Sequence, residues 1–281
     1  MASRAVVFAY HDVGARCLRA LLEAGVEVPL VVTHRDDPKE TIWFASVADF
    51  SRQQGIEVFE DLPDEEIESK VAKLKPEFIF SFYYRRMLPP SILGLAKRGA
   101  FNMHGSLLPK YRGRAPVNWA VLKGETETGA TLHEMVAKPD AGRIVDQERV
   151  PIGPDETAAD VFKKVTDAAE VVLRRSMKGL TDGTAKLKEQ DLSAGSYFGG
   201  RRPEDGRIDW SKSAREIHNL VRAVAPPYPG ALSQGLRILK TKLTGNESKE
   251  PIGPYRENGD WFAVCGDGKV LRLLEVEPIK K

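Results

Sequence analysis

The sequence predicts an α/β protein: a Rossmann-like domain with a mostly parallel sheet, followed by a small β-barrel-like domain. Over roughly the first two thirds of the chain, apolar runs of strand length alternate with amphipathic stretches of helix length. Apolar strands separated by helices indicate βαβ units, because a parallel sheet is covered by helices on both faces. In the last third, short strand-like runs are separated by glycine turns, which is typical of a small barrel.

Three strand and helix pairs are expected near the N-terminus. The strands are the apolar runs "AVVFAY", "VPLVVTH" and "FIFSFYY", at residues 5–10, 28–34 and 78–84. The helical patterns after the first two contain Leu18, Leu21 and Leu22, and Phe44, Val47 and Phe50, and the third strand precedes "PPSILGLAKRG". A parallel sheet binds ligands at the carboxyl ends of its strands. The residues expected at that edge are His11, Thr33, His34, Tyr83 and Tyr84.

The turn after the first strand, "YHDVGAR", holds a single glycine. A dinucleotide-binding fold would show G-x-G-x-x-G here, because those glycines let the backbone close on the pyrophosphate. Binding of NAD, FAD or a Walker-type nucleotide is therefore not expected.

The middle of the chain continues the alternation. A short helix is expected at 116–125 and a strand at 128–136, followed by a turn at 137–142 and a further strand. The stretch 155–180 predicts a long amphipathic helix with an acidic start and a basic end, as the helix dipole favours. This helix is expected to close a first domain at residues 1–189.

The remainder divides into a linker and a second domain. Residues 190–203 are polar and contain glycine, which suits a linker. Residues 204–281 begin with a helical pattern at 213–225 and continue with strand-like runs at "RILKTKLT", "DWFAVCG" and "VLRLLEVE". A small barrel of the OB type is expected there.

Composition limits the classes of partner. The 281 residues include 42 basic and 40 acidic side chains, a net charge of +2, so nothing in the balance indicates a nucleic acid or a membrane. No segment matches a signal peptide or the roughly 20 apolar residues of a membrane span. Cys17 and Cys265 lack CxxC spacing and are expected to be buried thiols. A reduced, cytoplasmic setting is expected.

The stretch "FNMHGSLLPKYRGRAP" contains the first candidates for chemistry. Asn102 and His104 are two residues apart at the end of an expected strand, so their side chains emerge on the same face. An amide donor beside an imidazole suits acyl transfer, in which a fixed donor stabilises the oxyanion by about 3 kcal/mol. The imidazole can also move a proton near neutral pH. Asp140, in its turn, could orient that imidazole and stabilise its charged form.

Each of these residues also has a structural interpretation. A histidine at a strand end is more often a hydrogen-bonded structural residue, and Asp140 before Ala-Gly suits an Asx turn. The loop "KYRGRAP" is either a solvated basic surface or a loop that binds phosphate or carboxylate. His11, His34 and His133 lack metal-ligand spacing, so they are expected to be structural or to face a substrate, and no metal is expected. The residues alone therefore indicate an α/β enzyme with a candidate oxyanion site.

A longer stretch adds a family resemblance. "FNMHGSLLPKYRGRAPVNWAVLKGETETGATLHEMVAKPDAGRIV" resembles the catalytic core of the 10-formyltetrahydrofolate-dependent formyltransferases. The pattern that they share is Asn-x-His, Ser-Leu-Leu-Pro, Arg-Gly and a distant Asp-x-Gly. The likeness extends to "VVFAYHDVG", "FSFYYRRML" and "GRRPEDGRIDWSKSAREIHNLVRAVAPPYPGA", and becomes loose only toward the C-terminus.

The resemblance implies both an activity and the residues behind it. Asn102 would stabilise the oxyanion, His104 would act as general acid, and Asp140 would stabilise the charged form of that histidine. No metal and no covalent intermediate are implied. The co-substrate 10-formyltetrahydrofolate would be held by Arg86, Met87, Leu88 and Arg114, and by Val136, Ala137, Lys138, Pro139 and Asp140.

The amine that accepts the formyl group is expected to belong to a UDP-linked amino sugar, since the likeness at both ends is to family members that act on such a sugar. Its two phosphates could be met by Arg201, Arg202 or Arg222, with Asn118 and His218 as polar partners. Each of these five could equally be a surface or packing residue.

Other functions stay open at this point. Formylation of methionyl-tRNA is disfavoured by the acidic residues interspersed in the last domain. A non-catalytic nucleotide-sugar-binding module and a hydrolase that releases formate are further alternatives. Similar enzymes continue into a decarboxylase domain, whereas this chain ends at Lys281. Either a stand-alone formyltransferase or one with a separate decarboxylase partner is expected, and the oligomeric state is open.

Overall fold

The computed structural model describes residues 2–38 and 40–279, which form two compact units. The first unit contains residues up to 113, 129–150 and 164–197, and the second contains 114–128, 151–163 and 198 onwards. Neither unit is one continuous segment, and the expected boundaries at residues 189 and 203 stay a prediction. In the described residues, no helix combines the length and the apolar character needed to cross a bilayer.

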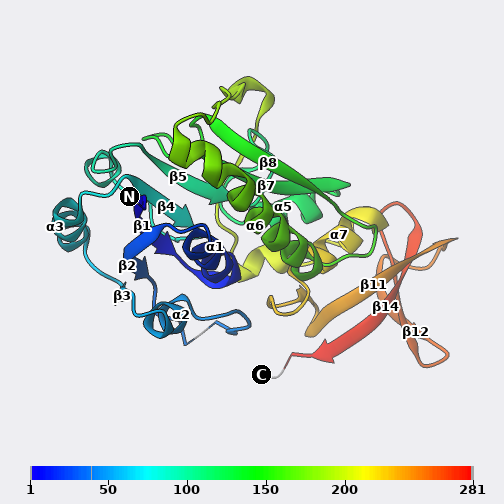
Figure 1. Ribbon diagram of the computed structural model, residues 1–281. Helices are drawn as coiled ribbons and strands as arrows, with labels where there is room; N and C mark the ends of the chain where they lie inside the picture. Colours follow the sequence, from blue (N-terminus) through cyan, green and yellow to red (C-terminus); the bar gives the residue numbers. More distant parts are fainter. Residues whose placement is uncertain (1, 39, 280–281) are drawn as a thin grey trace. The chain divides into compact units, whose positions relative to one another are not determined.

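The first unit is built on a seven-stranded sheet (Figure 1). Its strands are β1 (Arg4–Ala9), β2 (Glu27–Thr33), β3 (Glu57–Glu60), β4 (Phe78–Phe82), β5 (Gly99–His104), β7 (Glu127–Glu134) and β8 (Ile144–Pro151). Their order in the sheet is β3-β2-β1-β4-β5-β7-β8. The first five pair in parallel, and β7 runs antiparallel to β5. The predicted α/β class with a mostly parallel sheet is confirmed.

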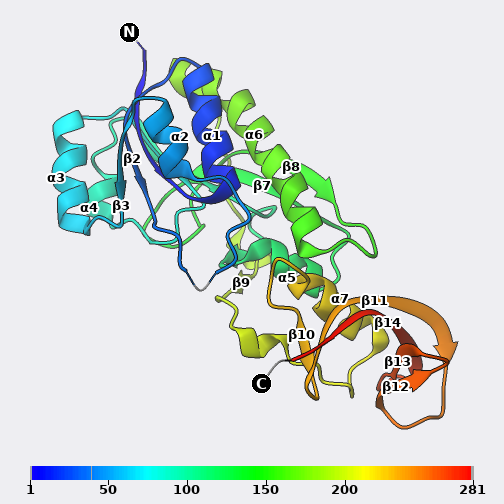
Figure 2. The ribbon, with the colours of Figure 1, turned by 90° about the horizontal axis from the view of Figure 1, so that it is seen from below.

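Helices cover both faces of this sheet. They are α1 (His11–Glu23), α2 (Val47–Gln53), α3 (Asp64–Leu74), α4 (Pro90–Leu93) and α6 (Ala158–Asp182). Figure 2 shows α1 and α6 on one side of the sheet and α3 and α4 on the other. Arg16 links α1 to α6, because its guanidinium donates to Glu170 at 2.7 Å and also pairs with Asp167, and both carboxylates belong to α6.

Local chemistry explains where some elements depart from expectation. α2 begins at Val47 rather than near Phe44, because the Ser46 hydroxyl accepts the backbone N–H of Asp49 at 3.1 Å and caps the helix. β4 ends before Tyr83, whose φ of 58° is incompatible with a strand. The sequence did not lead us to expect β3 or α3. β3 has only four residues, and α3 shows its start through three acidic residues after Pro63.

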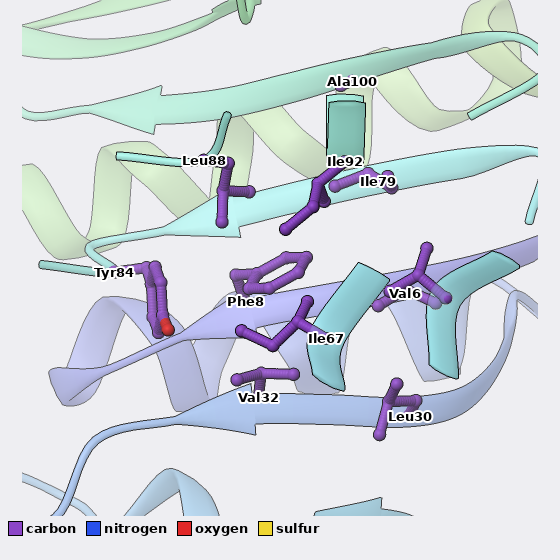
Figure 3. Packing of buried hydrophobic residues seen from close by; sticks show 11 residues of the cluster. Val6, Phe8, Leu30, Val32, Ile67, Ile79, Tyr84, Leu88, Ile92 and Ala100 are labelled. Carbon is purple, nitrogen blue, oxygen red and sulfur yellow. The ribbon is translucent and has the colours of Figure 1, made fainter. Parts of the chain in front are cut away.

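The face under α3 and α4 buries a continuous apolar cluster (Figure 3). The strands contribute Val6, Phe8, Leu30, Val32, Ile79 and Ala100, and the helices contribute Ile67, Val71 and Ile92. Phe8 packs edge to face against Tyr84, with ring centroids 5.3 Å apart. Because Tyr84 and Leu88 follow β4, the cluster also anchors the loop at the carboxyl end of that strand.

The second unit contains a five-stranded antiparallel sheet. Its strands are β10 (Ala231–Ser233), β11 (Leu236–Glu247), β12 (Gly253–Glu257), β13 (Asp260–Val264) and β14 (Lys269–Pro278), and its helices are α5 (Pro116–Leu122) and α7 (Ala214–Val224). The register of β11 against β14 shifts at three points, which bends this pair into a half-barrel. The expected barrel-like second part is confirmed in this form.

Short elements complete the chain. The strands β6 (Arg112–Gly113) and β9 (Tyr197–Phe198) pair with each other, and the 3-10 helices are η1 (Leu192–Ala194) and η2 (Pro203–Gly206). η1 and β9 therefore lie within the stretch that was expected to be a linker.

We expect Phe8→Ala to lower the free energy of unfolding by about 3–5 kcal/mol, because Phe8 is 0 % exposed and its removal leaves a cavity. Urea titration followed by circular dichroism measures the change. Val171→Ala is the control, since this α6 side chain is 48 % exposed, and it should change stability by no more than about 0.5 kcal/mol. Equal effects of the two substitutions would contradict the described core.

Candidate active site

Strand β5 places Asn102 and His104 on the same face of the sheet. Ala100, two residues before Asn102, packs into the cluster under α3 and α4, so both side chains lie on that side. In the antiparallel pairing with β7, Asn102 lies directly opposite His133, and His104 lies opposite Thr131. Residues opposite each other share a face, so β7 brings a second histidine to this position.

His104 is held from both ring nitrogens. The residue is 6 % exposed, and Nε2 donates to the backbone carbonyl of Tyr111 at 2.8 Å. Because a carbonyl only accepts, Nε2 carries a proton. The other nitrogen, Nδ1, lies 3.6 Å from Oδ1 of Asp140. A proton on Nδ1 would therefore lie against a carboxylate.

Asp140 lies between two imidazole rings. Its Oδ1 is 3.6 Å from Nδ1 of His104 and 3.5 Å from Nε2 of His133, and its Oδ2 accepts the backbone N–H of Gly113 at 2.8 Å. Burial by itself raises the pKa of Asp140. The histidines and the Gly113 hydrogen bond outweigh burial, and the pKa of Asp140 lies far below its usual value. Asp140 is therefore ionised at neutral pH.

His133 links Asp140 to Asn102. Its Nδ1 donates to the backbone carbonyl of Glu134 at 2.7 Å, so in the neutral ring Nε2 has a lone pair. In the neutral ring this Nε2 accepts a hydrogen bond from Nδ2 of Asn102, 3.2 Å away, whereas a charged ring turns an Nε2–H toward Oδ1 of Asp140, 3.5 Å away. The bond directs the amide nitrogen of Asn102 toward His133 and leaves its second N–H as a donor.

The turn that carries Asp140 is held in an unusual backbone conformation. Asp140 has a φ of 51°, in the left-handed region. Gly142 approaches β7 so closely that a Cβ atom there would lie 2.2 Å from the carbonyl oxygen of Glu134. Nε2 of Gln190 donates to the carbonyls of Asp140 and Gly142, at 3.1 and 2.6 Å. The Asp-x-Gly spacing therefore reflects a close backbone approach that only glycine permits.

Sequence reasoning placed Asn102, His104 and Asp140 in one site and did not assign a role to His133 or Gln190. We had expected His133 to be structural or to face a substrate. One signal could have shown its place: in an antiparallel pairing of 99–104 with 127–134, one register sets His133 against Asn102. Gln190 is 50 residues from Asp140 and gave no local signal.

The residues expected to hold folate in the first unit differ in environment. Arg86 donates to the carbonyl of Leu62 at 2.6 Å and pairs with Asp64, while Leu88 is buried in the apolar cluster. Met87 and Val136 are large apolar side chains that are 60 % and 41 % exposed. Ala137 and Lys138 are exposed and Pro139 is half-buried. Arg114 belongs to the second unit, where its backbone N–H donates to the carbonyl of Phe198 at 2.9 Å.

Three of the residues expected to bind the sugar nucleotide make internal bonds within the second unit. His218 is buried, and its ring nitrogens lie 2.9 Å from Oγ1 of Thr241 and 3.1 Å from the carbonyl of Pro154. Arg222 is buried too, and it donates to Asn219 and to the carbonyls of Gly153 and Glu156. Nδ2 of Asn118 donates to the carbonyl of Ala223 at 2.9 Å. These bonds favour a packing role around α7, whereas Arg201 and Arg202 lie in the more open loop before η2.

A separate cavity of about 210 Å³ lies at the carboxyl end of β2. Tyr10, His34, Asp36 and Phe44 are among the residues that line it, but Asn102, His104 and Asp140 are not. His34 stacks on Tyr84 with centroids 4.2 Å apart, and its Nε2 accepts the backbone N–H of Arg85 at 3.0 Å. Burial lowers the pKa of His34, so this ring is uncharged at neutral pH.

Within the described residues, no group of three or more His, Cys, Asp or Glu side chains is arranged to hold a metal ion. The polar side chains that meet at β5, β7 and the Asp140 turn are an amide, two imidazoles and a carboxylate.

Comparison with known families decides what this arrangement belongs to. A family model described as formyl transferase matches residues 4–177, and a model of the formyl transferase C-terminal domain matches residues 201–281. The chain belongs to the formyl transferase family. It is a formyl-transferring enzyme, and the site on β5 and β7 lies inside the segment that the first model matches.

Solved structures share the fold of this formyltransferase over nearly its whole length. An N-formyltransferase from Helicobacter canadensis, in complex with folinic acid and dTDP-3-aminofucose, is 24 % identical with a TM-score of 0.78, over 97 % of this chain and 99 % of that one. The sugar 3N-formyl transferase WlaRD is 21 % identical with a TM-score of 0.77, over 100 % and 99 %. A 4-N formyltransferase from Francisella tularensis is 18 % identical with a TM-score of 0.66, over 99 % of each chain.

We expect Asp140→Asn to lower the free energy of unfolding at pH 7, and the difference from the natural protein to shrink as the pH falls to 3. The pKa of Asp140 is lowered in the folded state. Its stabilisation is therefore present above the unfolded-state pKa of about 3.9 and is lost as the pH falls through the folded-state value. Urea titrations at pH 7, 5 and 3 measure this change.

Glu257→Gln serves as the control in those titrations, because it removes a negative charge from an exposed position in β12. A destabilisation by Asp140→Asn that grows on acidification would contradict the lowered pKa.

Proposed function

We propose that this formyltransferase transfers the formyl group of 10-formyltetrahydrofolate to the amine of a nucleotide-linked amino sugar. The single observation behind the chemistry is that β5 and the turn between β7 and β8 bring Asn102, His104 and Asp140 together, with His133 of β7 between Asn102 and Asp140. The complex of the Helicobacter relative with folinic acid and a dTDP-linked amino sugar supports this acceptor class. The sequence resemblance supports UDP-4-amino-4-deoxy-L-arabinose, the sugar of the polymyxin-resistance modification of lipid A, as the specific acceptor.

The reaction needs one bond to form and one to break. The neutral amine of the sugar attacks the formyl carbon, and the carbonyl electrons move to the oxygen. The free N–H of Asn102 and the protonated imidazole of His104 stabilise this oxyanion. When the tetrahedral intermediate collapses, the bond to N10 of the folate breaks, and His104 delivers a proton to N10 and takes up the proton lost by the amine.

Asp140 would act through His104 in this scheme. Because its pKa is far below the usual value, it stays negative throughout the reaction. Its charge, 3.6 Å from Nδ1, balances the imidazolium in a site from which water is largely excluded. His133 would hold the Asn102 amide in the orientation that aims a donor at the oxyanion.

The folate contacts that we propose use backbone and apolar groups. The side chain of Arg86 is engaged by Asp64 and Leu62, so its main chain is the part available for a hydrogen-bonded heterocycle. Met87 and Val136 expose apolar surface that an aromatic ring system would cover. Leu88, buried in the apolar cluster, would fix the position of this loop.

The charge pattern of the second unit favours a small acceptor over tRNA. Basic side chains on its sheet pair with neighbouring carboxylates: Arg272 with Asp260 at 2.8 Å, Arg237 with Glu277 at 3.2 Å, and Lys240 with Glu275 at 3.8 Å. A tRNA-binding surface needs cations that are free to neutralise phosphates. The half-barrel sheet therefore presents a mixed rather than a basic surface.

We expect His104→Ala to lower kcat by about 10²–10⁴-fold, because the proton transfers lose their carrier. Asn102→Ala should lower kcat by about 10²–10³-fold through the loss of one oxyanion donor. Formylation of the amino sugar is followed by mass spectrometry, and far-UV circular dichroism verifies the fold. Near-wild-type kcat in either folded variant would refute its role.

The acceptor is tested by offering 10-formyltetrahydrofolate together with UDP-4-amino-4-deoxy-L-arabinose, dTDP-3-aminofucose, charged initiator tRNA or water alone. We expect formylation of the UDP-sugar to have the highest kcat/KM. A higher kcat/KM with the dTDP-sugar would replace the UDP-sugar as the specific acceptor. Transfer only to tRNA, or release of formate alone, would refute the proposed function. No turnover with any of them would favour a non-catalytic module.

A further inference from the structure

An aromatic pair in the second unit is rigidly fixed. Trp119 of α5 stacks on Phe198 of β9, with ring centroids 4.8 Å apart and ring planes 27° from parallel. Nε1 of Trp119 donates to the backbone carbonyl of Gly199 at 3.0 Å. Both rings are half-buried, so the indole has a defined position and orientation.

Arg201 lies on this pair. Its guanidinium carbon is 5.0 Å from the centroid of the Trp119 ring. The guanidinium therefore lies over an indole that also stacks on Phe198. Nη2 of Arg201 donates to the backbone carbonyl of Asp205 at 3.1 Å. The cation is thus held by a ring and by a carbonyl, both of which leave its charge intact.

Arg201 differs in this respect from three arginines of the first unit. Arg143, Arg174 and Arg175 each pair with a carboxylate at 2.9 Å or less. In the described part of the chain, Arg201 forms no ion pair with a carboxylate, although it is half-buried. Burial lowers its pKa and the nearby Asp205 raises it, with burial the larger effect. A partly desolvated cation that is not directly paired with a carboxylate can receive an anion without displacing a partner.

A second cation and an open loop adjoin Arg201. Nζ of Lys123 lies over the Phe198 ring, 6.0 Å from its centroid, and Lys123 is exposed. The loop between Phe198 and Arg201 is Gly199-Gly200, and a Cβ atom at Gly199 would meet nothing within 4 Å. An anion can therefore approach the backbone as well as both cations.

We propose that Arg201, Lys123 and the Gly199-Gly200 loop bind the diphosphate of the sugar nucleotide, with the stack of Trp119 and Phe198 as their support. A guanidinium matches the geometry of phosphate oxygens in a bidentate contact. Phe198 and Arg201 both lie against Trp119, and the polar groups of the cluster are cations and backbone, so we assign it to phosphate rather than to the base. This site deepens the proposed function and rests on it for the identity of the ligand.

The test is calorimetric titration of UDP, inorganic pyrophosphate and folinic acid into the natural protein and its variants. Arg201→Gln should weaken binding of UDP and of pyrophosphate by about tenfold or more, as expected for loss of a charged hydrogen bond. The affinity of Arg201→Lys for UDP and pyrophosphate should lie between those of the natural protein and Arg201→Gln, because lysine keeps the charge but lacks the planar guanidinium. Folinic acid should bind all forms equally.

Arg256→Gln is the matched control. Arg256 of β12 lies over the Trp261 ring at 4.5 Å, so it makes the same kind of contact on the half-barrel sheet. This variant should bind UDP as the natural protein does, and thermal melts verify that each variant is folded.

Unchanged affinity of folded Arg201→Gln for UDP and pyrophosphate would overturn the proposed site. A variant that loses only folinic acid binding would also overturn it, because Arg201 would then bind the carboxylates of the folate. If the enzyme formylates the sugar nucleotide with the same KM in Arg201→Gln, the function stands and the site fails. If no sugar nucleotide is formylated but pyrophosphate binding still depends on Arg201, the site stands and the proposed function fails.

Discussion

The carboxylate of Asp140, negative and largely buried between two imidazoles, is the constraint on which the site depends. Burial opposes its charge, and only the combined action of His104, His133 and the Gly113 N–H outweighs that cost. Each of these partners must therefore be held in place by other parts of the unit. Tyr111 holds His104 through its carbonyl, Glu134 holds His133, and Gln190 holds the turn at Asp140 itself.

The antiparallel strand β7 makes this arrangement compact. In the parallel part of the sheet, polar side chains meet at the carboxyl edge after each strand. Between β5 and β7, the reversed direction instead sets Asn102 directly against His133 on one face. Ala100, two residues earlier on β5, packs into the apolar cluster below α3 and α4, so the face that carries Asn102 and His104 continues from the core. A substitution that loosens this cluster would therefore reach the site through β5.

The features of the site that could be predicted from the sequence are those that depend on the spacing of nearby residues. Asn102 and His104 share a face because strands have a period of two, and the Asp-x-Gly turn was recognisable from resemblance. His133 was not assigned because its partner, Asn102, is 31 residues away in sequence. The two residues meet only through the register in which β5 and β7 pair. His218 and Arg222 were plausible ligand residues because both are polar, yet their acceptors at Pro154, Gly153 and Glu156 are 64 to 69 residues away. Short elements such as β3 contain too few residues for an alternation of apolar and polar side chains to be recognised.

Two of the ways in which this protein holds arginine have different consequences for anions. An arginine paired with a carboxylate, such as Arg175 with Asp146, can bind a phosphate only if the phosphate displaces that partner. An arginine held against an aromatic face keeps its charge, because the ring contributes a quadrupole and no net charge. Arg201 is restrained in this second way, and its position is fixed by a ring that is itself stacked and hydrogen-bonded. Binding of an anion then costs little side-chain entropy, because Arg201 is already ordered before the anion binds.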